Sequence, residues 1–364
     1  MVDYNEKIKE LEAEMSKMQY NKRTQHHYGL IRAKIAKLKE RDIKRSSGKG
    51  KTSGYSVKKS GDASVILIGF PSAGKSTLLN AITGAESEVA AYEFTTLDVV
   101  PGLLKHKHAQ IQMLDVPGIV HGAASGRGRG KEVLAVMRSA NLAVVVIDVH
   151  KPEQCPALLK EVYDSGLRLN KEVPIIKISK KTKGGLDIAA TVKLKHITKA
   201  TIAAILKEFR IFNADVVIRS DITVDDLIDS IEANKIYIPA IVVINKIDSA
   251  DEEVIQNVVD ELSPDLCISA NEGTNIDRLK DLIFDGLDFM RVYCKEVGKP
   301  ADMDVPLIIN KKSTIKDMCE KLHRDFVNKF KFARVWGPSA KFPGQKFLYK
   351  HKLKDEDIVE LHIR

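Results

Sequence analysis

The chain has 364 residues, a net charge of +9 and four widely spaced cysteines. This length favours two or three domains, and 44% hydrophobic with 29% charged residues is typical of a globular protein. The longest apolar run, residues 142–147, is far shorter than the ~20 residues of a membrane span, so we expect no membrane partner. We also expect no secretory signal at the charged N-terminus. The absence of a CxxC pair argues against disulfides and zinc and favours a cytoplasmic location.

The positive charge is concentrated in residues 1–60, which hold 16 basic and 7 acidic residues, whereas the rest of the chain holds 42 of each. A concentrated basic segment attracts polyanions through phosphate contacts. We therefore expect a ribosome or RNA partner here. The alternative is a solvated helical surface with a flexible tether.

Residues 5–40 are predicted to form an antiparallel helical hairpin with a turn near 21–27. Apolar residues recur at spacings of three and four, as on one face of a helix; the two sets are Ile8, Leu11, Met15 and Met18, then Tyr28, Ile31, Ile35 and Leu38. The following residues, 46–62, are rich in Ser, Gly and Lys, which indicates a linker.

From Ala63 onward, short apolar runs alternate with helical patterns, which is typical of an α/β domain with a parallel-type sheet. The predicted strands of this sheet are 65–68, 111–114, 142–147 and 240–244. Beyond Met303 the order changes, and a compact β/α module is predicted. Its helix is capped by Ser313 and Thr314, and its strands are 305–309, 333–336, 347–349 and 358–363.

Residues 69–76 match the phosphate-binding pattern GxxxxGK[ST] between a predicted strand and a predicted helix. Gly69 and Gly74 let the backbone curl so that its N–H groups point at phosphates, and the helix N-terminus adds a favourable dipole. Lys75 neutralises phosphate charge, and the Ser76 hydroxyl binds Mg²⁺. The alternative, a glycine turn with a surface lysine, is disfavoured.

Two further motifs follow predicted strands. Asp115 begins a DxxG pattern that ends at Gly118, and it lies at the strand edge where open α/β sheets bind ligands. Asp115 is placed to hold Mg²⁺ through water, and the Gly118 amide to meet the γ-phosphate. Asn245, Lys246 and Asp248 belong to NKID directly after the strand 240–244.

The NKID motif favours guanine. A carboxylate at Asp248 accepts from both donors on the Watson–Crick edge of guanine, N1–H and the 2-amino group, and adenine lacks this pair of donors. Ser269, Ala270 and Asn271 end another short apolar stretch and are placed to close over the base. The motifs together favour GTP over ATP.

The segment YEFTTL, residues 92–97, lies between the first two motifs. A threonine hydroxyl here completes Mg²⁺ coordination when the γ-phosphate is present, which makes an order–disorder switch. Two adjacent threonines, Thr95 and Thr96, leave the choice between them open from chemistry alone.

With these elements the chain resembles the developmentally regulated GTP-binding (DRG) family of the Obg-related GTPases. The resemblance extends over nearly the full length and is carried by GFPSAGKSTLLN, YEFTTL, QMLDVPGIVHGAASGRGRGKEV, NKID and LKDEDIVELHI. It implies a helical N-terminal domain, a GTPase core with an S5D2-like insertion, a C-terminal ubiquitin-like TGS domain (a β-grasp fold), and work on ribosomes or translation. It also implies that Thr96 is the magnesium threonine. Eukaryotic members act with a regulatory protein partner.

We therefore expect the chain to be a Mg²⁺-dependent GTPase. Its catalytic residues are Lys75, Thr96 and Gly118, and its metal ligands are Ser76, Thr96 and, through water, Asp115. The residues expected to contact GTP or GDP are Gly69, Phe70, Pro71, Ser72, Ala73, Gly74, Lys75, Ser76, Thr77, Phe94, Thr95, Thr96, Asp115, Gly118, Asn245, Lys246, Asp248, Ser269, Ala270 and Asn271.

We expect a basic helical hairpin with linker over residues 1–60, a GTPase domain over 61–290 and a TGS domain over 291–364. An insertion is expected at about 152–237, because the 127 residues from Gly118 to Asn245 exceed the roughly 60 that two helices and two strands need. Strands near 175–179 and 216–219 make this insertion a small α+β module, and its many lysines leave RNA contact and a solvated face equally open.

Ile119 stands where many GTPases carry the glutamine that orients the attacking water. The isoleucine side chain neither donates nor accepts a hydrogen bond, so we expect a molecular switch with slow intrinsic hydrolysis that needs help to position water.

Ser72 occupies the P-loop position where cation-assisted GTPases often carry asparagine, which leaves K⁺ activation open. Arg127 and Arg129 offer positive charge near the γ-phosphate, although a solvated loop is favoured, and His121 is disfavoured as a base.

Two other functions compete with a switch. A GTP-loaded binding scaffold with incidental turnover is the main alternative, and the residue at 119 is compatible with it. A phosphotransferase is disfavoured because NKID reads guanine. In the C-terminal module, aromatic residues alternate with lysines between 336 and 352; RNA stacking is one interpretation, and a half-buried rim of the β module is the favoured one.

Overall fold

The structure is a computed structural model that describes residues 4–19, 21, 23–46, 61–84, 100–115, 136–137 and 139–363. Several residues singled out in the sequence lie outside this described part: Phe94, Thr95, Thr96, Gly118, Ile119, His121, Arg127 and Arg129. Among the described residues, no helix has both the length and the apolar character required to cross a bilayer.

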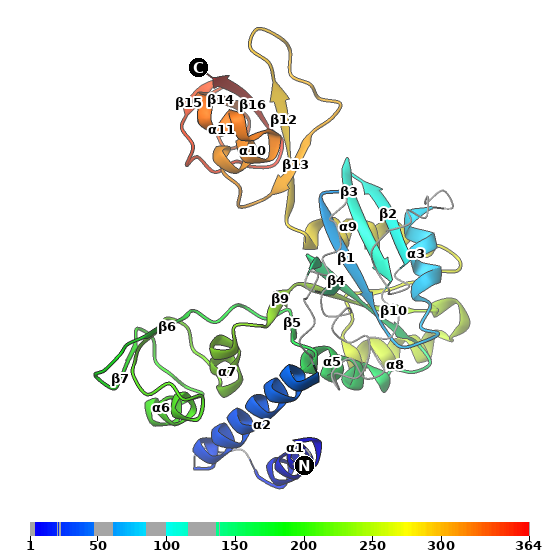
Figure 1. The fold of residues 1–364 in the computed structure, drawn as a ribbon. Coiled ribbons are helices and arrows are strands. Elements are labelled where there is room, and N and C mark those ends of the chain that lie inside the picture. The colour runs from blue at the N-terminus through cyan, green and yellow to red at the C-terminus, as the bar shows by residue number, and fades with distance from the viewer. Residues whose placement is uncertain are drawn as a thin grey trace. The chain divides into compact units, whose positions relative to one another are not determined.

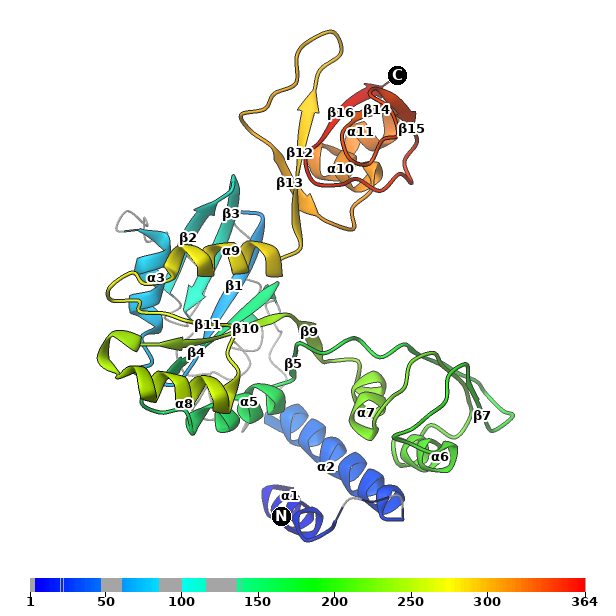
Figure 2. The same cartoon turned by 180° about the vertical axis from the view of Figure 1, so that it is seen from behind.

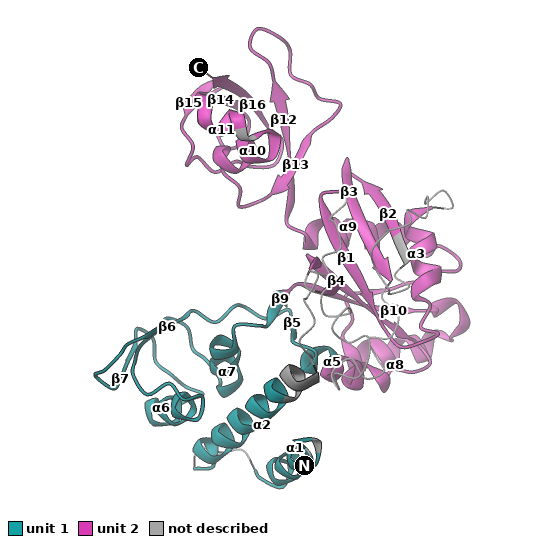
Figure 3. Cartoon of the chain, in the orientation of Figure 1, with its two compact units in different colours: residues 1–54, 122–131, 162–237 teal, residues 55–121, 132–161, 238–364 magenta. Residues whose placement is uncertain are grey.

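The chain divides into two compact units (Figure 3). Unit 1 contains residues 1–54, 122–131 and 162–237, and unit 2 contains residues 55–121, 132–161 and 238–364. Unit 1 takes up the chain again at residue 162, inside the helix α5 (Gln154–Asp164), and the start of the insertion at about residue 152 stays an expectation.

A six-stranded sheet with the order β11-β10-β4-β1-β3-β2 forms the centre of unit 2 (Figure 1). All neighbouring strands in it are parallel except β2 and β3. The strands are β1 Ala63–Ile68, β2 Val100–His106, β3 Ala109–Asp115, β4 Leu142–Asp148, β10 Ala240–Asn245 and β11 Leu266–Cys267. The predicted α/β fold class is confirmed.

Strand β2 makes the sheet mixed, whereas the sequence predicts a parallel-type sheet without it. It pairs antiparallel with β3 from Val100 opposite Asp115 to His106 opposite Ala109. The two residues of the turn, Lys107 and His108, both have positive φ, 48° and 67°. Such turns are usually marked by Asn-Gly or Asp-Gly. Because neither pair is present here, the sequence carries little sign of this hairpin.

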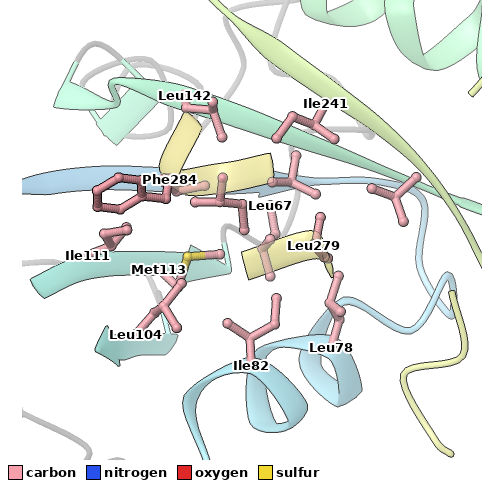
Figure 4. Packing of buried hydrophobic residues seen from close by; sticks show 14 of the residues in the cluster. Leu67, Leu78, Ile82, Leu104, Ile111, Met113, Leu142, Ile241, Leu279 and Phe284 are labelled. Atoms are coloured by element: carbon pink, nitrogen blue, oxygen red, sulfur yellow. The ribbon is translucent and has the colours of Figure 1, made fainter. Parts of the chain in front are cut away.

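Helices cover both faces of the sheet. On one face, α3 (Lys75–Thr83) and α9 (Ile276–Gly286) pack their apolar stripes on alternate residues of β1 and β3, and Figure 4 shows Leu78, Leu279 and Leu67 meeting in this core. Helix α8 (Glu252–Leu262) lies on the opposite side of β10 from α9 (Figure 2). The remaining helical elements here are α5 (Gln154–Asp164) and the short 3₁₀ helix η1 (Ile247–Ser249).

The C-terminal module is a five-stranded sheet of order β13-β12-β16-β14-β15 with helices α10 and α11. The predicted helix is confirmed, because Thr314 caps α10 and forms a capping box with Asp317. The sheet begins with β12, a strand that the sequence does not predict and that starts shortly before residue 291. The bounds are β12 Phe289–Lys295, β13 Leu307–Asn310, α10 Ile315–Leu322, α11 Arg324–Lys329, β14 Phe330–Trp336, β15 Gln345–Phe347 and β16 Asp357–Ile363.

Unit 1 combines the N-terminal helices with the inserted residues. The helices α1 (Tyr4–Ser16) and α2 (Gln25–Ser46) pack through Ile8, Ile31 and Ile35, as the apolar spacing predicts. The inserted elements are β5 Leu167–Leu169, β6 Ile176–Lys180, β7 Leu186–Ala190, α6 Lys199–Glu208, β8 Ala214–Ile218, α7 Val224–Glu232 and β9 Ile236–Ile238. A three-stranded sheet of order β6-β8-β7 and a β5-β9 pair result.

Helix α2 packs on the inserted helix α6, a contact that the sequence does not predict. A Cβ atom on Gly29 would lie 3.0 Å from Thr201 Cγ2, so the absence of a side chain permits this close approach. Two ion pairs also join α2 to the inserted helices: Arg32 pairs with Asp225 of α7 at 2.8 Å, and Lys37 pairs with Glu208 of α6 at 3.1 Å. Part of the N-terminal positive charge is therefore paired within unit 1.

A buried ion pair fixes the β5-β9 pair to helix α7. Arg168 donates two hydrogen bonds to Asp229, at 2.6 and 2.8 Å, and both side chains are 4% exposed. The Arg168 guanidinium also lies 3.6 Å from the ring centroid of Tyr163. Burial, followed by the charge of Asp229, raises the pKa of Tyr237 to about 12, so this phenol stays neutral near pH 7.

Replacing Asp229 by alanine is expected to lower the free energy of unfolding by about 3–5 kcal/mol, because Arg168 becomes an uncompensated buried charge. The matched control is Asp215→Ala, which removes the partner of Lys181 from a pair with 37% and 44% exposed side chains. That change should cost below about 1 kcal/mol. Urea unfolding followed by circular dichroism measures both, and equal losses would contradict the buried-pair interpretation.

Candidate nucleotide site

The loop between β1 and α3 has the backbone of a phosphate cradle. Gly74 precedes the first residue of α3 with φ 87°, a conformation that side chains rarely adopt. A Cβ atom there would lie 2.3 Å from Asn245 Nδ2, so glycine is required for space as well as for backbone conformation. No side chain of the described residues caps the N-terminus of α3, and the first N–H groups of a helix have no partner within it, so this end of the helix favours an anion.

Lys75 folds its side chain back across this loop. Its ammonium donates to the carbonyl oxygens of Gly69 and Phe70, both at 3.0 Å. Burial lowers the pKa of Lys75 below its ordinary value, and the charge of Asp115 opposes this shift. A phosphate placed in the loop would supply further negative charge beside a partly desolvated cation.

Ser76 and Asp115 meet at the end of the sheet. The Ser76 hydroxyl donates to Asp115 Oδ2 at 2.7 Å. Asp115 is 6% exposed, and its other oxygen, Oδ1, is buried with no hydrogen-bond partner among the described residues. A carboxylate and a hydroxyl are oxygen ligands of the kind that Mg²⁺ takes, so this pair fits the predicted metal.

The side chain of Asn245 joins three loops. Its Nδ2 donates to Ala73 O in the phosphate loop at 2.9 Å, and its Oδ1 accepts from the Ala270 amide at 3.0 Å. Asn245 is 1% exposed. Both polar groups of a buried amide are therefore satisfied, each by a different segment.

Asp248 lies three residues further along. Ser269 Oγ donates to Asp248 Oδ1 at 2.5 Å, and the same Ser269 oxygen accepts from the Glu272 amide at 3.1 Å. The carboxylate is thus held in one orientation by a residue of the neighbouring loop. Its remaining acceptor capacity is available to a ligand.

Three full-length relatives bear on the identity of the chain. An uncharacterized GTP-binding protein of Methanocaldococcus jannaschii is 50% identical over 99% of this chain and 93% of its own length. Developmentally-regulated G-protein 3 of Arabidopsis thaliana is 46% identical, and Ribosome-interacting GTPase 1 of Saccharomyces cerevisiae is 44% identical, each over 98% of both chains. Residues 64–181 match the family described as 50S ribosome-binding GTPase, residues 183–289 the C-terminal region of that domain, and residues 290–363 the TGS domain.

The chain belongs to the developmentally regulated GTP-binding protein family. In this family member the structure brings together most of the expected site residues, from the ends of β1, β3, β10 and β11. Pro71, Thr77 and Asn271 lie in the same segments with exposed side chains. The expected roles of Phe94, Thr95, Thr96 and Gly118 fall outside the described residues and stay predictions.

Sequence reasoning missed one acidic residue at this edge. Asp148 ends β4, next to β10 in the sheet, and is 8% exposed. Its signal is visible in the sequence: an acid directly after the apolar run 142–147, as Asp115 follows a similar run.

Lys75→Ala should weaken GDP and GTP binding by about 100-fold, because two charge-assisted hydrogen bonds to phosphate are worth on the order of 3 kcal/mol together. Lys105→Ala, an exposed lysine on β2, is the matched control and should leave both affinities unchanged. Titration calorimetry with Mg²⁺ present measures the dissociation constants. Equal affinity for wild type and Lys75→Ala would argue against phosphate binding in this loop.

Proposed function

We propose that this DRG-family chain is a Mg²⁺-dependent GTPase that uses residues 69–76, Asp115 and the NKID turn to bind guanine nucleotides and acts as a molecular switch on ribosomes. The observation that supports this most directly is the position of Asn245. Its side chain links the phosphate loop to Ala270, and the neighbouring Ser269 donates to Asp248. The phosphate loop and the carboxylate proposed to bind the base are therefore connected through hydrogen bonds.

Base recognition is proposed to rest on Asp248. Its carboxylate is a pure acceptor, oriented by Ser269, and guanine offers two adjacent donors on its Watson–Crick edge. Asp248 is exposed in the structure, so a bound base would be the group that covers it. An acceptor covered by adenine would be left unpaired, which is a strong basis for rejection. Ala270 and Asn271 follow Ser269 and are proposed to close over the base.

The phosphate side is proposed to use Lys75 for charge and Ser76 with Asp115 for the metal. Bound Mg²⁺ would neutralise charge on the β- and γ-phosphates. The chain's own contribution is to position these groups: the loop fixes the phosphates, and Ser76 and Asp115 already lie 2.7 Å apart. Thr96, Thr95 and Gly118 are proposed to complete the γ-phosphate side.

Slow intrinsic hydrolysis is part of the proposal. Ile119 has no group to orient water, so the isolated chain should turn over GTP slowly. Ribosomes, a regulatory protein or K⁺ would then supply the missing positioning. The family description and the yeast relative's name both mention ribosomes, and the basic N-terminal segment supplies charge for a contact with RNA.

Asp248→Asn is expected to exchange guanine for xanthine as the preferred base. Asparagine replaces one acceptor by a donor, and xanthine carries a carbonyl where guanine carries the 2-amino group. GDP affinity should fall by at least about 100-fold, while xanthosine diphosphate binds more tightly than it binds wild type. Competition against a fluorescent nucleotide measures both. Retained guanine preference would contradict the assignment of Asp248.

Single-turnover GTP hydrolysis with and without ribosomes tests the switch. We expect stimulation by at least about tenfold, since the positioning that Ile119 lacks must come from outside. The GTP-loaded scaffold remains the second candidate because Ile119 is compatible with it. Rates that no ribosome preparation, K⁺ concentration or cell extract fraction changes would favour that scaffold instead.

A further inference from the structure

The end of β4 carries a charged network beside the proposed base site. Asp148 Oδ2 accepts from Lys246 Nζ at 2.7 Å, and Asp148 Oδ1 accepts from the backbone amide of His150 at 3.0 Å. Burial alone would raise the pKa of Asp148, but the hydrogen bonds from Lys246 and His150 outweigh it and lower the pKa. Asp148 is therefore ionised near pH 7 and faces the Lys246 ammonium.

The same segment holds the backbone of Lys246. Lys246 has φ 69°, which costs energy for a residue with a side chain. Ser249 Oγ donates its single proton to Lys246 O at 2.8 Å, so the contact of 2.9 Å between Ser249 and His150 must have His150 Nε2–H as the donor. The Val149 amide also donates to Asn245 O at 3.1 Å.

Lys246 runs along the phosphate loop. A Cβ atom on Gly74 would lie 3.9 Å from Lys246 Cε, beside its closer contact with Asn245. The lysine stem therefore lies beside Gly74 of the phosphate loop, and Asp248 follows two residues further along the chain. Its side chain is 36% exposed, against 9% for Asp148, so the carboxylate is the fixed member of the pair.

We propose that Asp148 is a positioning residue for guanine nucleotides, which acts by holding Lys246 along the phosphate loop while His150 and Ser249 hold the backbone of the same turn. The inference rests on the nucleotide site of the proposed function. Without Asp148 the Lys246 ammonium moves into water. The free energy of nucleotide binding must then include the cost of ordering the Lys246 side chain again. The described contacts of this network involve the NKID turn and the phosphate loop, which GDP and GTP share, so both nucleotides should lose affinity equally.

The test is a double-mutant cycle on nucleotide affinity. Asp148→Asn keeps the shape and an acceptor for the His150 amide but loses the charge, and it should weaken GDP and GTP binding by about tenfold each, with an unchanged rate at saturating GTP. Lys246→Met keeps most of the stem, and in that background Asp148→Asn should have no further effect. Glu253→Gln, an exposed acid on α8, is the matched control and should bind as wild type does.

Two outcomes overturn the inference: wild-type affinity in Asp148→Asn, or losses that add fully in the double variant, since Asp148 would then act by a route other than Lys246. Melting curves with saturating GDP establish folding. If Asp148→Asn does not fold, Asp148→Glu replaces it, and its loss of affinity must likewise vanish in the Lys246→Met background. A wild-type protein that binds no guanine nucleotide refutes the proposed function instead, so the two failures are distinct.

Discussion

The buried amide of Asn245 is the contact on which the proposed site depends. It reaches Ala73, 172 positions earlier in the chain, and Ala270, 25 positions later. A parallel sheet makes this geometry available, because β1, β10 and β11 all end at the same edge. An aspartate in its place would lose the donor, and a leucine would lose both groups and leave the partners unpaired in a buried setting. Asparagine is the side chain of this size that supplies one donor and one acceptor.

The sequence predicts those parts of the molecule whose chemistry is local. The buried strands β1, β4 and β10 are continuous apolar runs, and the cap of α10 is a threonine three residues before an aspartate. What it does not predict depends on partners distant in the chain or on unmarked turns. The turn between β2 and β3 consists of Lys107 and His108 and contains no glycine. The approach of α2 to α6 depends on Gly29, and the role of this glycine is visible only in the structure, where Thr201 lies opposite it.

The same reasoning revises the meaning of the N-terminal charge. Residues 1–60 do carry an excess of basic residues, but some of those on α2 form ion pairs with acidic residues of the insertion. Arg32 and Lys37 have Asp225 and Glu208 as partners, and Lys39 has both Glu12 and Asp164 within ion-pair distance. These pairs join elements that are distant in sequence, so composition alone overstates the charge that remains for an RNA contact. The proposed partner must meet the remaining lysines and arginines of the segment.

Different groups of residues are proposed to set the affinity for guanine nucleotides and to distinguish GTP from GDP. The contacts that are already formed without a ligand involve the phosphate loop, the NKID turn and Ser269. GDP and GTP share the base and the first phosphates, so such preformed contacts favour both nucleotides alike. A contact that is equally strong in the GDP-bound and the GTP-bound protein does not shift the equilibrium between two conformations of the switch. Discrimination between GTP and GDP must therefore come from groups that meet the γ-phosphate, which is the role proposed for Thr95, Thr96 and Gly118. Asp248 and Asn245 are proposed to keep a guanine nucleotide bound throughout the cycle.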